Sequence, residues 1–283
     1  MTYKIMNDLV FKYVYGQDTL TSKRALKGLL ETFLELKIKE VEIKNTNVPA
    51  RNIRSKDSRF DVMAQLDNHT MIDIEMQMES TTDSLTNRLE SYSAKMLSNQ
   101  DQKGKMYRDL KPCYVLIFTD ANIYDDDYMI KTFQFRSEYD TLLSPNSLSH
   151  IIIVEMKKLR ISDKMSLKEE YVYYLKNCQN AQNDSKIKSI LEHVEVIRMA
   201  DKCLNEITDE YWQTLNKEFD ELKKNENEVR EKYYQDKYRD EGRAEERSEM
   251  IHTLSQSMSV QQIASALGKS VNEIENILGQ TSV

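Results

Sequence analysis

Two neighbouring segments, residues 59–66 and 71–78, alternate apolar and polar side chains with the two-residue period of a β-strand. The turn-forming residues Asp67-Asn68-His69 separate them, so we expect an antiparallel hairpin. The apolar side chains of both strands lie at even residue numbers, so they enter one core only if the numbers of paired residues sum to an even value. A shift of the pairing by one residue would move every side chain of one strand to the opposite face. The rule excludes every register in which the paired residue numbers sum to an odd value.

The register of this hairpin brings two acidic residues together. A three-residue loop pairs Leu66 with Thr70, which sets Asp61 directly opposite Glu75. Directly opposed side chains have Cβ atoms about 5 Å apart, so two carboxylates there repel unless a positive charge lies between them. Mg²⁺ suits that position because it takes oxygen ligands, usually one or two carboxylates plus water. The alternative is a solvated acidic face on which Arg59 neutralises Asp61.

Helical and strand patterns alternate around the hairpin. Apolar residues at helical spacing predict helices near residues 9–14, 26–34 and 85–96. Short apolar runs predict further strands at residues 113–119, 132–136 and 150–156. Asn7 or Asp8 is available to cap the first helix. This order of elements predicts an α/β fold.

The pattern is helical throughout after about residue 160. A coiled-coil-like seam predicts a homo-oligomer formed through the C-terminal half, and its residues are Trp212, Leu215, Phe219 and Leu222. The spacing of Ala264, Gly268 and Ile274 is typical of a helix-turn-helix. We therefore expect an α/β domain, a helical extension, a long charged helix and a small helix-turn-helix-like motif, at residues 1–160, 161–207, 208–250 and 251–283.

Composition excludes several classes of protein. A net charge of −7 argues against a protein that coats nucleic acid non-specifically, although it allows a local basic groove. The longest apolar run is far shorter than the roughly 20 residues of a membrane helix, and no signal-peptide core follows the start. We therefore expect a cytoplasmic protein with no membrane partner. Scattered histidines and separated cysteines give no zinc site and no Ser-His-Asp arrangement.

Six short motifs follow one another in the first 159 residues. They are NDLVFKYVYG (7–16), RFDV (59–62), IEMQ (74–77), RLESY (88–92), GKMY (104–107) and CYVLIF (113–118). Their order and spacing resemble the PD-(D/E)xK nuclease superfamily, and more closely the Rpn family of recombination-promoting nucleases, also labelled transposases. The resemblance implies a restriction-endonuclease-like mixed sheet flanked by helices, followed by a helical C-terminal region. It also implies a bacterial, Mg²⁺-dependent DNA endonuclease linked to recombination or mobile elements.

The resemblance assigns roles to five residues of the central motifs. Asp61 and Glu75 are implied to be metal ligands, with the main-chain carbonyl of Met76 as a third oxygen. Gln77 falls where the superfamily has lysine, and an amide can position water but brings no positive charge. Arg88 is implied to hold a phosphate bidentately and so to replace part of the missing charge.

Three further residues are candidates of second rank. Asp8 either completes the metal site through water or caps the first helix. Tyr92 lies four residues after Arg88 on the same helix face and either points to the site or belongs to the core. Asp73 shares a strand face with Glu75, lies one step nearer the turn and ranks below Asp61.

Two clusters of basic residues are expected to contact a DNA backbone. The residues singled out are Arg54, Lys56, Arg59, Lys95, Lys103 and Lys105. In the predicted register Arg59 also lies opposite Gln77, and Lys95 is either a displaced catalytic lysine or a solvated residue. The negative net charge of the chain and the amide at Gln77 favour an alternative function, that of a catalytically inactive nuclease fold that binds DNA or mediates assembly. A transposase that joins strands is a third hypothesis.

Overall fold

A computed structural model describes residues 5–44, 47–48, 58–59, 61–77, 85–100, 106–144 and 147–279. The chain divides into two compact units, Met1–Asn216 and Lys217–Val283. The domain limits expected from the sequence stay predictions. None of the helices in these described ranges is long and apolar enough to cross a membrane.

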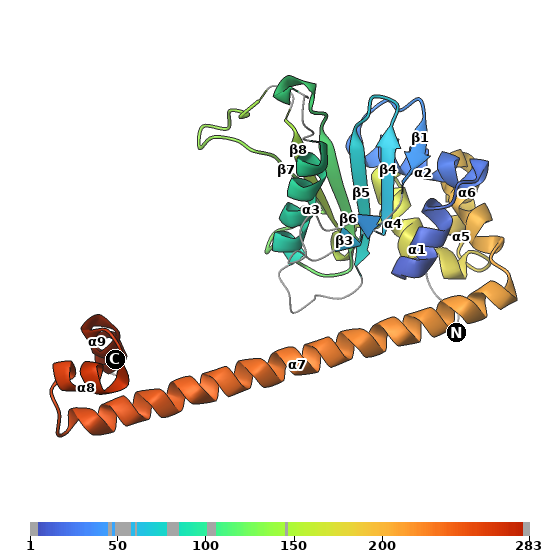
Figure 1. Ribbon diagram of the computed structural model, residues 1–283. Coiled ribbons are helices and arrows are strands. Elements are labelled where there is room, and N and C mark those ends of the chain that lie inside the picture. Colours follow the sequence, from blue (N-terminus) through green and yellow to red (C-terminus); the bar gives the residue numbers. More distant parts are fainter. Residues whose placement is uncertain are drawn as a thin grey trace. The chain divides into compact units, whose positions relative to one another are not determined.

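The first unit is built on a mixed sheet that has six strands within the described residues, in the order β1-β4-β5-β6-β8-β7 (Figure 1). These strands are β1 (Val41–Ile43), β4 (Val62–Leu66), β5 (Met71–Gln77), β6 (Cys113–Thr119), β7 (Ile130–Phe133) and β8 (Ser149–Glu155). The central strands β5, β6 and β8 run parallel, and the outer strands pair with them or with each other in antiparallel fashion. A separate antiparallel pair joins β2 (Asn47–Val48) to β3 (Ser58–Arg59). The expected α/β fold with a mixed sheet is confirmed.

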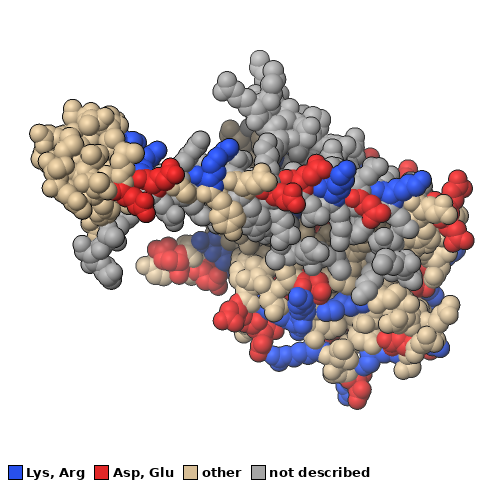
Figure 2. All heavy atoms as spheres, turned by 90° about the horizontal axis from the view of Figure 1, so that it is seen from below, with Lys and Arg blue, Asp and Glu red and all other residues tan. Residues whose placement is uncertain are grey.

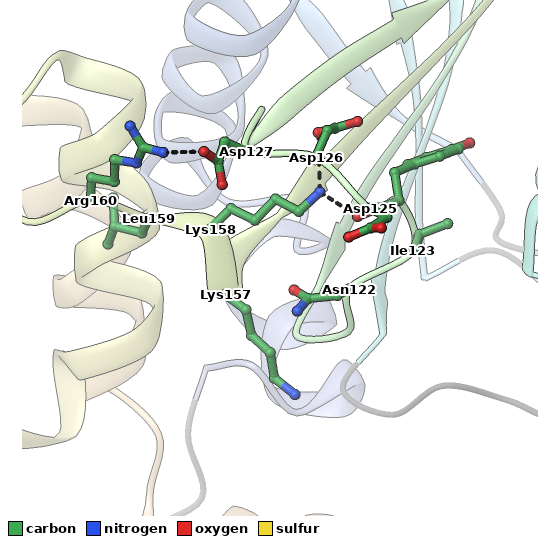
Figure 3. A pocket seen from close by; sticks show the side chains of 10 residues that line it. Asn122, Ile123, Asp125, Asp126, Asp127, Lys157, Lys158, Leu159 and Arg160 are labelled. Atoms are coloured by element: carbon green, nitrogen blue, oxygen red, sulfur yellow. Dashed lines mark hydrogen bonds and ion pairs between the residues drawn. The ribbon is translucent and has the colours of Figure 1, made fainter.

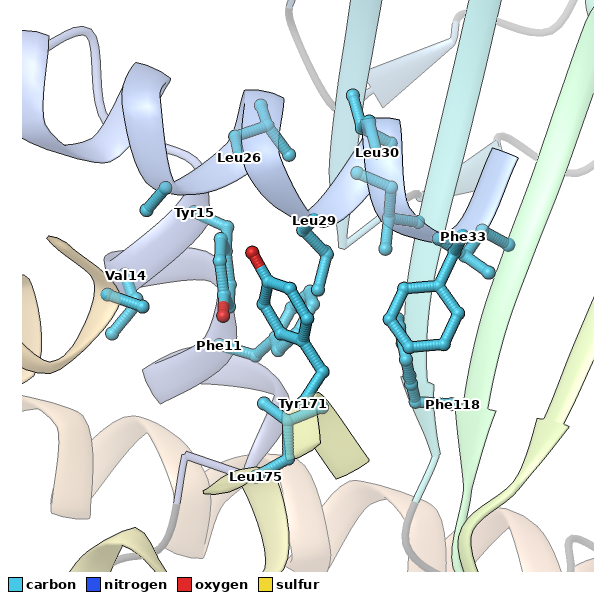
Figure 4. Close-up of a cluster of buried hydrophobic side chains, with 14 of the residues drawn as sticks. Phe11, Val14, Tyr15, Leu26, Leu29, Leu30, Phe33, Phe118, Tyr171 and Leu175 are labelled. Carbon is cyan, nitrogen blue, oxygen red and sulfur yellow. The ribbon is translucent and has the colours of Figure 1, made fainter. Parts of the chain in front are cut away.

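Helices cover both faces of this sheet (Figure 1). One face carries α1 (Asp8–Tyr15), α2 (Leu20–Leu34), α4 (Leu167–Asn177), α5 (Ser185–His193) and α6 (Glu195–Asn205), which share one hydrophobic cluster with the sheet. Figure 4 shows part of that cluster, where Phe33 meets Phe118 edge to face with ring centres 4.9 Å apart and Tyr171 packs close by. The opposite face is covered by α3 (Leu85–Gln100), with Leu89 and Met96 buried against the strands. Short 3₁₀ helices lie at Tyr107–Asp109, Met156–Lys158 and Cys178–Asn180.

Gly28 lies where α2 crosses α6. A Cβ added at Gly28 would lie 2.3 Å from the Cβ of Val196, well inside contact distance. We therefore expect Gly28→Ala to lower the free energy of unfolding by about 1–3 kcal/mol, as overpacking does in a filled core. Urea unfolding measures this change.

Gly242→Ala is the matched control, because a Cβ added at Gly242 meets nothing within 4 Å. This control should keep or raise stability, by up to about 1 kcal/mol, since alanine favours a helix over glycine. An unchanged unfolding midpoint for Gly28→Ala would contradict the close helix crossing.

The hairpin has the register that the sequence predicts. Ala64 pairs with Ile72, and the Leu66 N–H donates to the Thr70 carbonyl at 2.9 Å. His69 takes a left-handed conformation with φ of 66°, as the last residue of a three-residue hairpin loop often does. The apolar faces of both strands therefore enter the core beneath α1 and α2.

One expectation about the hairpin is wrong, and the alternative interpretation of its second face is wrong as well. β4 begins at Val62, and Arg59 instead belongs to β3, where it pairs with Asn47 and not with Gln77. The second face of the hairpin is not solvated, because α3 covers it and buries Met63 to 5% exposure. An acidic residue on that face is therefore buried.

The helix α7 (Asp209–Ser255) is followed by α8 (Val260–Leu267) and α9 (Val271–Gly279), the two short helices predicted at this end. Ala264 and Ile274 are buried together with Ile251 of α7. Gly268 caps α8 in a left-handed conformation with φ of 63°, which glycine adopts without strain. The turn of the predicted helix-turn-helix-like motif is therefore present.

The seam predicted to mediate self-association is only partly described. The side chains of Leu215, Phe219 and Leu222 lie outside the described residues. Trp212 packs against Val10 and Ile207 within its own unit. Homo-oligomerisation through this region stays a prediction.

Candidate functional site

The candidate site lies at the end of β5, where the hairpin holds Asp61 beside Glu75. The Oδ2 atom of Asp61 accepts a hydrogen bond from the Met76 N–H at 2.8 Å. The N–H of Asp61 donates to Oε1 of Glu75 at 3.3 Å. Each acid is thus bound to the main chain of the other's strand, and the structure brings together the two residues predicted to be ligands. Their role as ligands stays a prediction.

Both acids are held in surroundings that disfavour negative charge. Burial raises the pKa of Asp61 to about 6, and the charge of Asp8 acts in the same direction. Burial and then the charge of Asp61 raise the pKa of Glu75, which is 5% exposed, to about 8. The positive charge of Arg88 lowers the pKa of both acids, but by less than their surroundings raise it. The site therefore has an excess of carboxylate over cationic charge, which a bound cation would balance.

Arg88 reaches from α3 to β5 above the two acids. Its Nη2 donates to Oε1 of Gln77 at 2.9 Å and lies 3.8 Å from Oε2 of Glu75. The side chain of Arg88 is 28% exposed, and its Nε atom has no hydrogen-bond partner within the described part of the chain. Gln77 therefore fixes the orientation of Arg88, while part of the Arg88 side chain stays exposed to solvent.

Tyr92 borders the same site. The Cζ atom of Arg88 lies 6.0 Å from the centre of the Tyr92 ring, within range of a cation–π contact. Burial and then the charge of Glu75 raise the pKa of the Tyr92 hydroxyl to about 12. The ring also packs on the cluster beneath α3, so both interpretations of this residue hold.

Asp73 lies on β5 two residues before Glu75 and on the same face. It is fully buried, no N–H or hydroxyl group of the described residues donates to its carboxyl oxygens, and its side chain shares a hydrogen bond with the carboxyl group of Glu75. Its neighbours on the adjacent strands are Met63 and Val115, which are apolar. Burial and then the charge of Glu75 raise the pKa of Asp73 well above its ordinary value. The alternation of β5 indicated its face, but not its burial.

Asp8 approaches the site from the start of α1 and does not cap that helix. The cap is Asn7, whose Oδ1 accepts from the Leu9 N–H at 3.0 Å, so the capping interpretation of Asp8 is wrong. Asp8 and Lys12 both act electrostatically on Asp61, Asp8 raising its pKa and Lys12 lowering it. Lys12 was not singled out from the sequence, although its spacing of four residues from Asp8 places both on one helix face.

The predicted DNA-backbone contacts are largely untested. Lys95 is partly buried on α3 and lies two helical turns after Arg88. Arg59 is described only in its main chain, and four residues lie outside the described ranges: Arg54, Lys56, Lys103 and Lys105. On the face drawn in Figure 2, the basic and acidic side chains that are coloured lie intermingled. Contacts to a DNA backbone stay predictions.

A cavity of about 610 Å³ opens beside the end of β8 (Figure 3). The buried carboxylate of Glu155 accepts hydrogen bonds from Lys131 at 2.9 Å and Lys158 at 2.8 Å. Arg160 pairs with Asp127 at 2.7 Å on the cavity wall (Figure 3). These charges compensate one another and fasten the loop of residues 120–129 to the sheet, so we assign this cavity a structural role.

The acids at the end of β5 offer oxygen donors of the kind that a hard divalent cation prefers. Within the residues that the structure describes, no three His, Cys, Asp or Glu side chains form a group that could hold a metal ion. A site built on the two carboxylates of Asp61 and Glu75 fits Mg²⁺, which is usually held by one or two carboxylates and completed by water and substrate.

Comparison with known proteins agrees with this geometry. A family model described as a PD-(D/E)XK nuclease family transposase matches residues 5–241. The matched range contains every acid of the site together with Gln77, Arg88 and Tyr92. No curated protein and no solved structure matches the chain.

Proposed function

The chain belongs to the PD-(D/E)XK nuclease family transposases, as the order of its motifs predicts, and we propose that it is a DNA endonuclease that depends on a divalent cation. Family membership supports a nuclease-like function associated with transposition. The observation that carries the finer proposal is the Asp61–Glu75 pair. These two acids are held side by side through main-chain hydrogen bonds, in surroundings short of positive charge.

Asp61 and Glu75 would hold the cation, with the main-chain carbonyl of Met76 as a further oxygen donor. A bound Mg²⁺ polarises a phosphoryl oxygen and lowers the pKa of a water molecule. The reciprocal hydrogen bonds of Asp61 and Glu75 restrict both carboxylates before any ligand arrives. Such preorganisation spares the site a rearrangement during the reaction.

Arg88 is the residue that we propose to bind the phosphate. Its planar guanidinium suits bidentate contact with phosphate oxygens, and its side chain is 28% exposed beside the two acids. Gln77 holds Arg88 in place through the 2.9 Å hydrogen bond and does not supply charge itself. Arg88 therefore contributes positive charge at a site where the superfamily has a lysine, and Lys12 adds to the field around Asp61.

The cellular setting follows from the family and is part of the same proposal. DNA is the proposed substrate, in a bacterial cytoplasm and in recombination or the movement of mobile elements. The family description names a transposase, which also favours strand joining as an outcome.

A second candidate function is DNA binding or assembly without turnover. Gln77 favours it, because an amide stands in place of a lysine and is engaged with Arg88. Such a protein would bind DNA through the same surface and leave the phosphodiester bonds intact.

Incubation of the full-length protein with supercoiled plasmid tests these functions. We expect nicked or linear DNA with Mg²⁺ or Mn²⁺, no product with EDTA, and recovery when the cation is restored in excess. The reason is that the paired carboxylates need the cation to bring a phosphate close.

DNA binding without cleavage under either cation would refute the endonuclease and support the binding protein. Covalent joining of a labelled oligonucleotide to the plasmid would identify strand transfer. Cleavage that persists in EDTA would contradict the proposed dependence on a cation.

A further inference from the structure

Exposed apolar side chains gather on the segment that begins at the end of β7. We call residues 133–144 the arm, and Figure 1 shows it projecting beyond the sheet between β7 and β8. Four large apolar side chains of the arm are exposed to between 39% and 83%, namely Phe133, Phe135, Tyr139 and Leu143. Single exposed apolar residues are common, but a group of them on one short segment marks a surface for another molecule.

The arm is held in a hairpin by its own hydrogen bonds. A β-bridge pairs Arg136 with Leu142, and the Leu143 N–H donates to the Phe135 carbonyl at 3.0 Å. In this register Phe135 lies directly opposite Leu143, so the two side chains share one face of the hairpin. The guanidinium of Arg136 donates to Oδ1 of Asp140 at 3.0 Å. The arm therefore presents a fixed pair of apolar side chains to solvent.

β7 is the outermost strand on its side of the sheet in the described part of the chain. The Glu155 N–H donates to the Met129 carbonyl at 2.8 Å, and successive residues of a strand direct their main-chain groups to opposite sides, so those of Thr132 point away from β8. Lysine or proline often protects such an edge from pairing. Lys131 of β7 instead binds the buried Glu155 at 2.9 Å, and residues 128–144 contain no proline. This edge is therefore open to another strand.

The charge and the position of the arm argue against nucleic acid as its partner. Residues 133–144 contain one basic residue, Arg136, and two acidic ones, Glu138 and Asp140. β5, β6 and β8 run in parallel register, and Phe133 pairs with Ile151 near the start of β8, whereas the candidate site lies at the end of β5. The arm therefore leaves the sheet at the edge opposite to the one where DNA would be cleaved.

We propose that the arm and the edge of β7 form an interface with a second copy of this chain, in which the two β7 strands pair in antiparallel fashion. A two-fold interface uses the same surface on both chains, and an apolar, nearly neutral surface with an open strand edge is complementary to itself. This inference does not depend on the proposed function. It also concerns a different surface from the C-terminal seam.

The exposed area of the arm agrees with an interface of this kind. If each of the four apolar side chains measures roughly 150–250 Å² in full, they offer about 400–650 Å² of mainly apolar surface. A specific interface removes about 800 Å² from each partner. The main chain of β7 and the polar side chains of the arm would supply the remainder.

Light scattering of the full-length protein at micromolar concentration tests this interface. We expect Phe135→Ser/Leu143→Ser to halve the mass of the particle, because the change removes apolar contacts from both chains at once. Thr132→Pro should also halve it, since proline removes the outward N–H and keeps the hydrogen bonds to β8. The circular dichroism spectra should stay those of the wild type, because the changed residues lie outside the core.

Leu20→Ser/Ile161→Ser is the matched control, because Leu20 and Ile161 are exposed to 68% and 63% elsewhere on the same unit. It should keep the mass of the wild type. A monomeric wild type would overturn the inference, and so would an unchanged mass in either variant. An unchanged mass together with weaker binding of plasmid DNA by Phe135→Ser/Leu143→Ser would also overturn it, and would assign the arm to DNA.

Discussion

Asp61→Asn should reduce cation-dependent plasmid cleavage by about a thousandfold or more and leave the fold intact. Asparagine retains an oxygen that can accept the hydrogen bond from the Met76 N–H, so the link between the two strands is kept. What is lost is the negative charge at Asp61. Electrostatic stabilisation by a metal ion contributes several kcal/mol to such reactions, and every 1.4 kcal/mol is a factor of ten in rate. Initial rates of plasmid nicking measure the effect.

A comparison with Asp61→Ala separates chemistry from structure. Alanine removes the acceptor as well as the charge and leaves the Met76 N–H without its partner, which costs about 1–3 kcal/mol of stability when the group is buried. Both variants should be inactive, and only the alanine variant should lose stability for this reason. Asp67→Asn should cleave at the wild-type rate. Full activity in Asp61→Asn would remove Asp61 from the site.

The hairpin could be predicted because two local rules act on it together. The alternation of residues 59–66 and 71–78 fixes which side chains share a face, and a loop of three residues fixes the register. Together they predict that Asp61 meets Glu75, as the hydrogen bond from the Asp61 N–H to Oε1 of Glu75 shows. The parallel strand Cys113–Thr119 is likewise identified by its run of apolar residues, which is typical of a strand buried on both faces.

The burial of the second face depends on contacts between distant segments and could not be inferred in the same way. Alternation shows that Asp73 and Glu75 share a face, but a solvated face and one covered by a helix have the same pattern. The packing of α3 against Met63 shows that this face is covered by a helix and is not solvated. Its own periodicity indicated an amphipathic helix without indicating which surface the helix would cover.

The sequence pattern also could not predict the shortest strands or the residues at which helices begin. β1 has three residues, too few for a periodic signal, and it pairs with β4 by antiparallel contacts made in the folded protein. Asn7 and Asp8 both suit a cap position, so the sequence left the choice open. The structure gives the cap to Asn7, which frees Asp8 to act on Asp61.

The metal-free protein should lose stability as the pH rises from about 4 to about 8. In an unfolded chain, Asp and Glu ionise near pH 3.9 and 4.3. In the folded protein the pKa of Asp61 is about 6 and that of Glu75 about 8, so over this interval the folded state keeps protons that the unfolded chain has released. For each pH unit in which the folded state holds one extra proton, the free energy of unfolding falls by about 1.4 kcal/mol. Urea unfolding in EDTA at a series of pH values measures the decline.

Cation binding should change in the opposite direction over the same interval. A cation competes with protons for the two carboxylates, so its affinity should rise about tenfold per pH unit for each proton that must leave. Saturating Mg²⁺ should therefore flatten the pH dependence of stability, because binding to the folded state offsets the cost of the buried charges. Titration calorimetry at pH 6 and pH 8 (about a hundredfold apart for a single proton) provides the second measurement.

The double variant Asp61→Asn/Glu75→Gln identifies the source of both trends. Other groups that titrate in this interval, such as His150 and His193, are the same in the variant and the wild type. The difference between the two proteins therefore reports the ionisation of the carboxylate pair together with its effect on Asp73, whose pKa the charges of Glu75 and Asp61 raise. The variant should be more stable than the wild type at pH 8 in EDTA, since it carries no buried charge at these positions. Equal slopes of stability against pH in the two proteins would show that Asp61 and Glu75 ionise normally, and the excess negative charge inferred for the site would then be wrong.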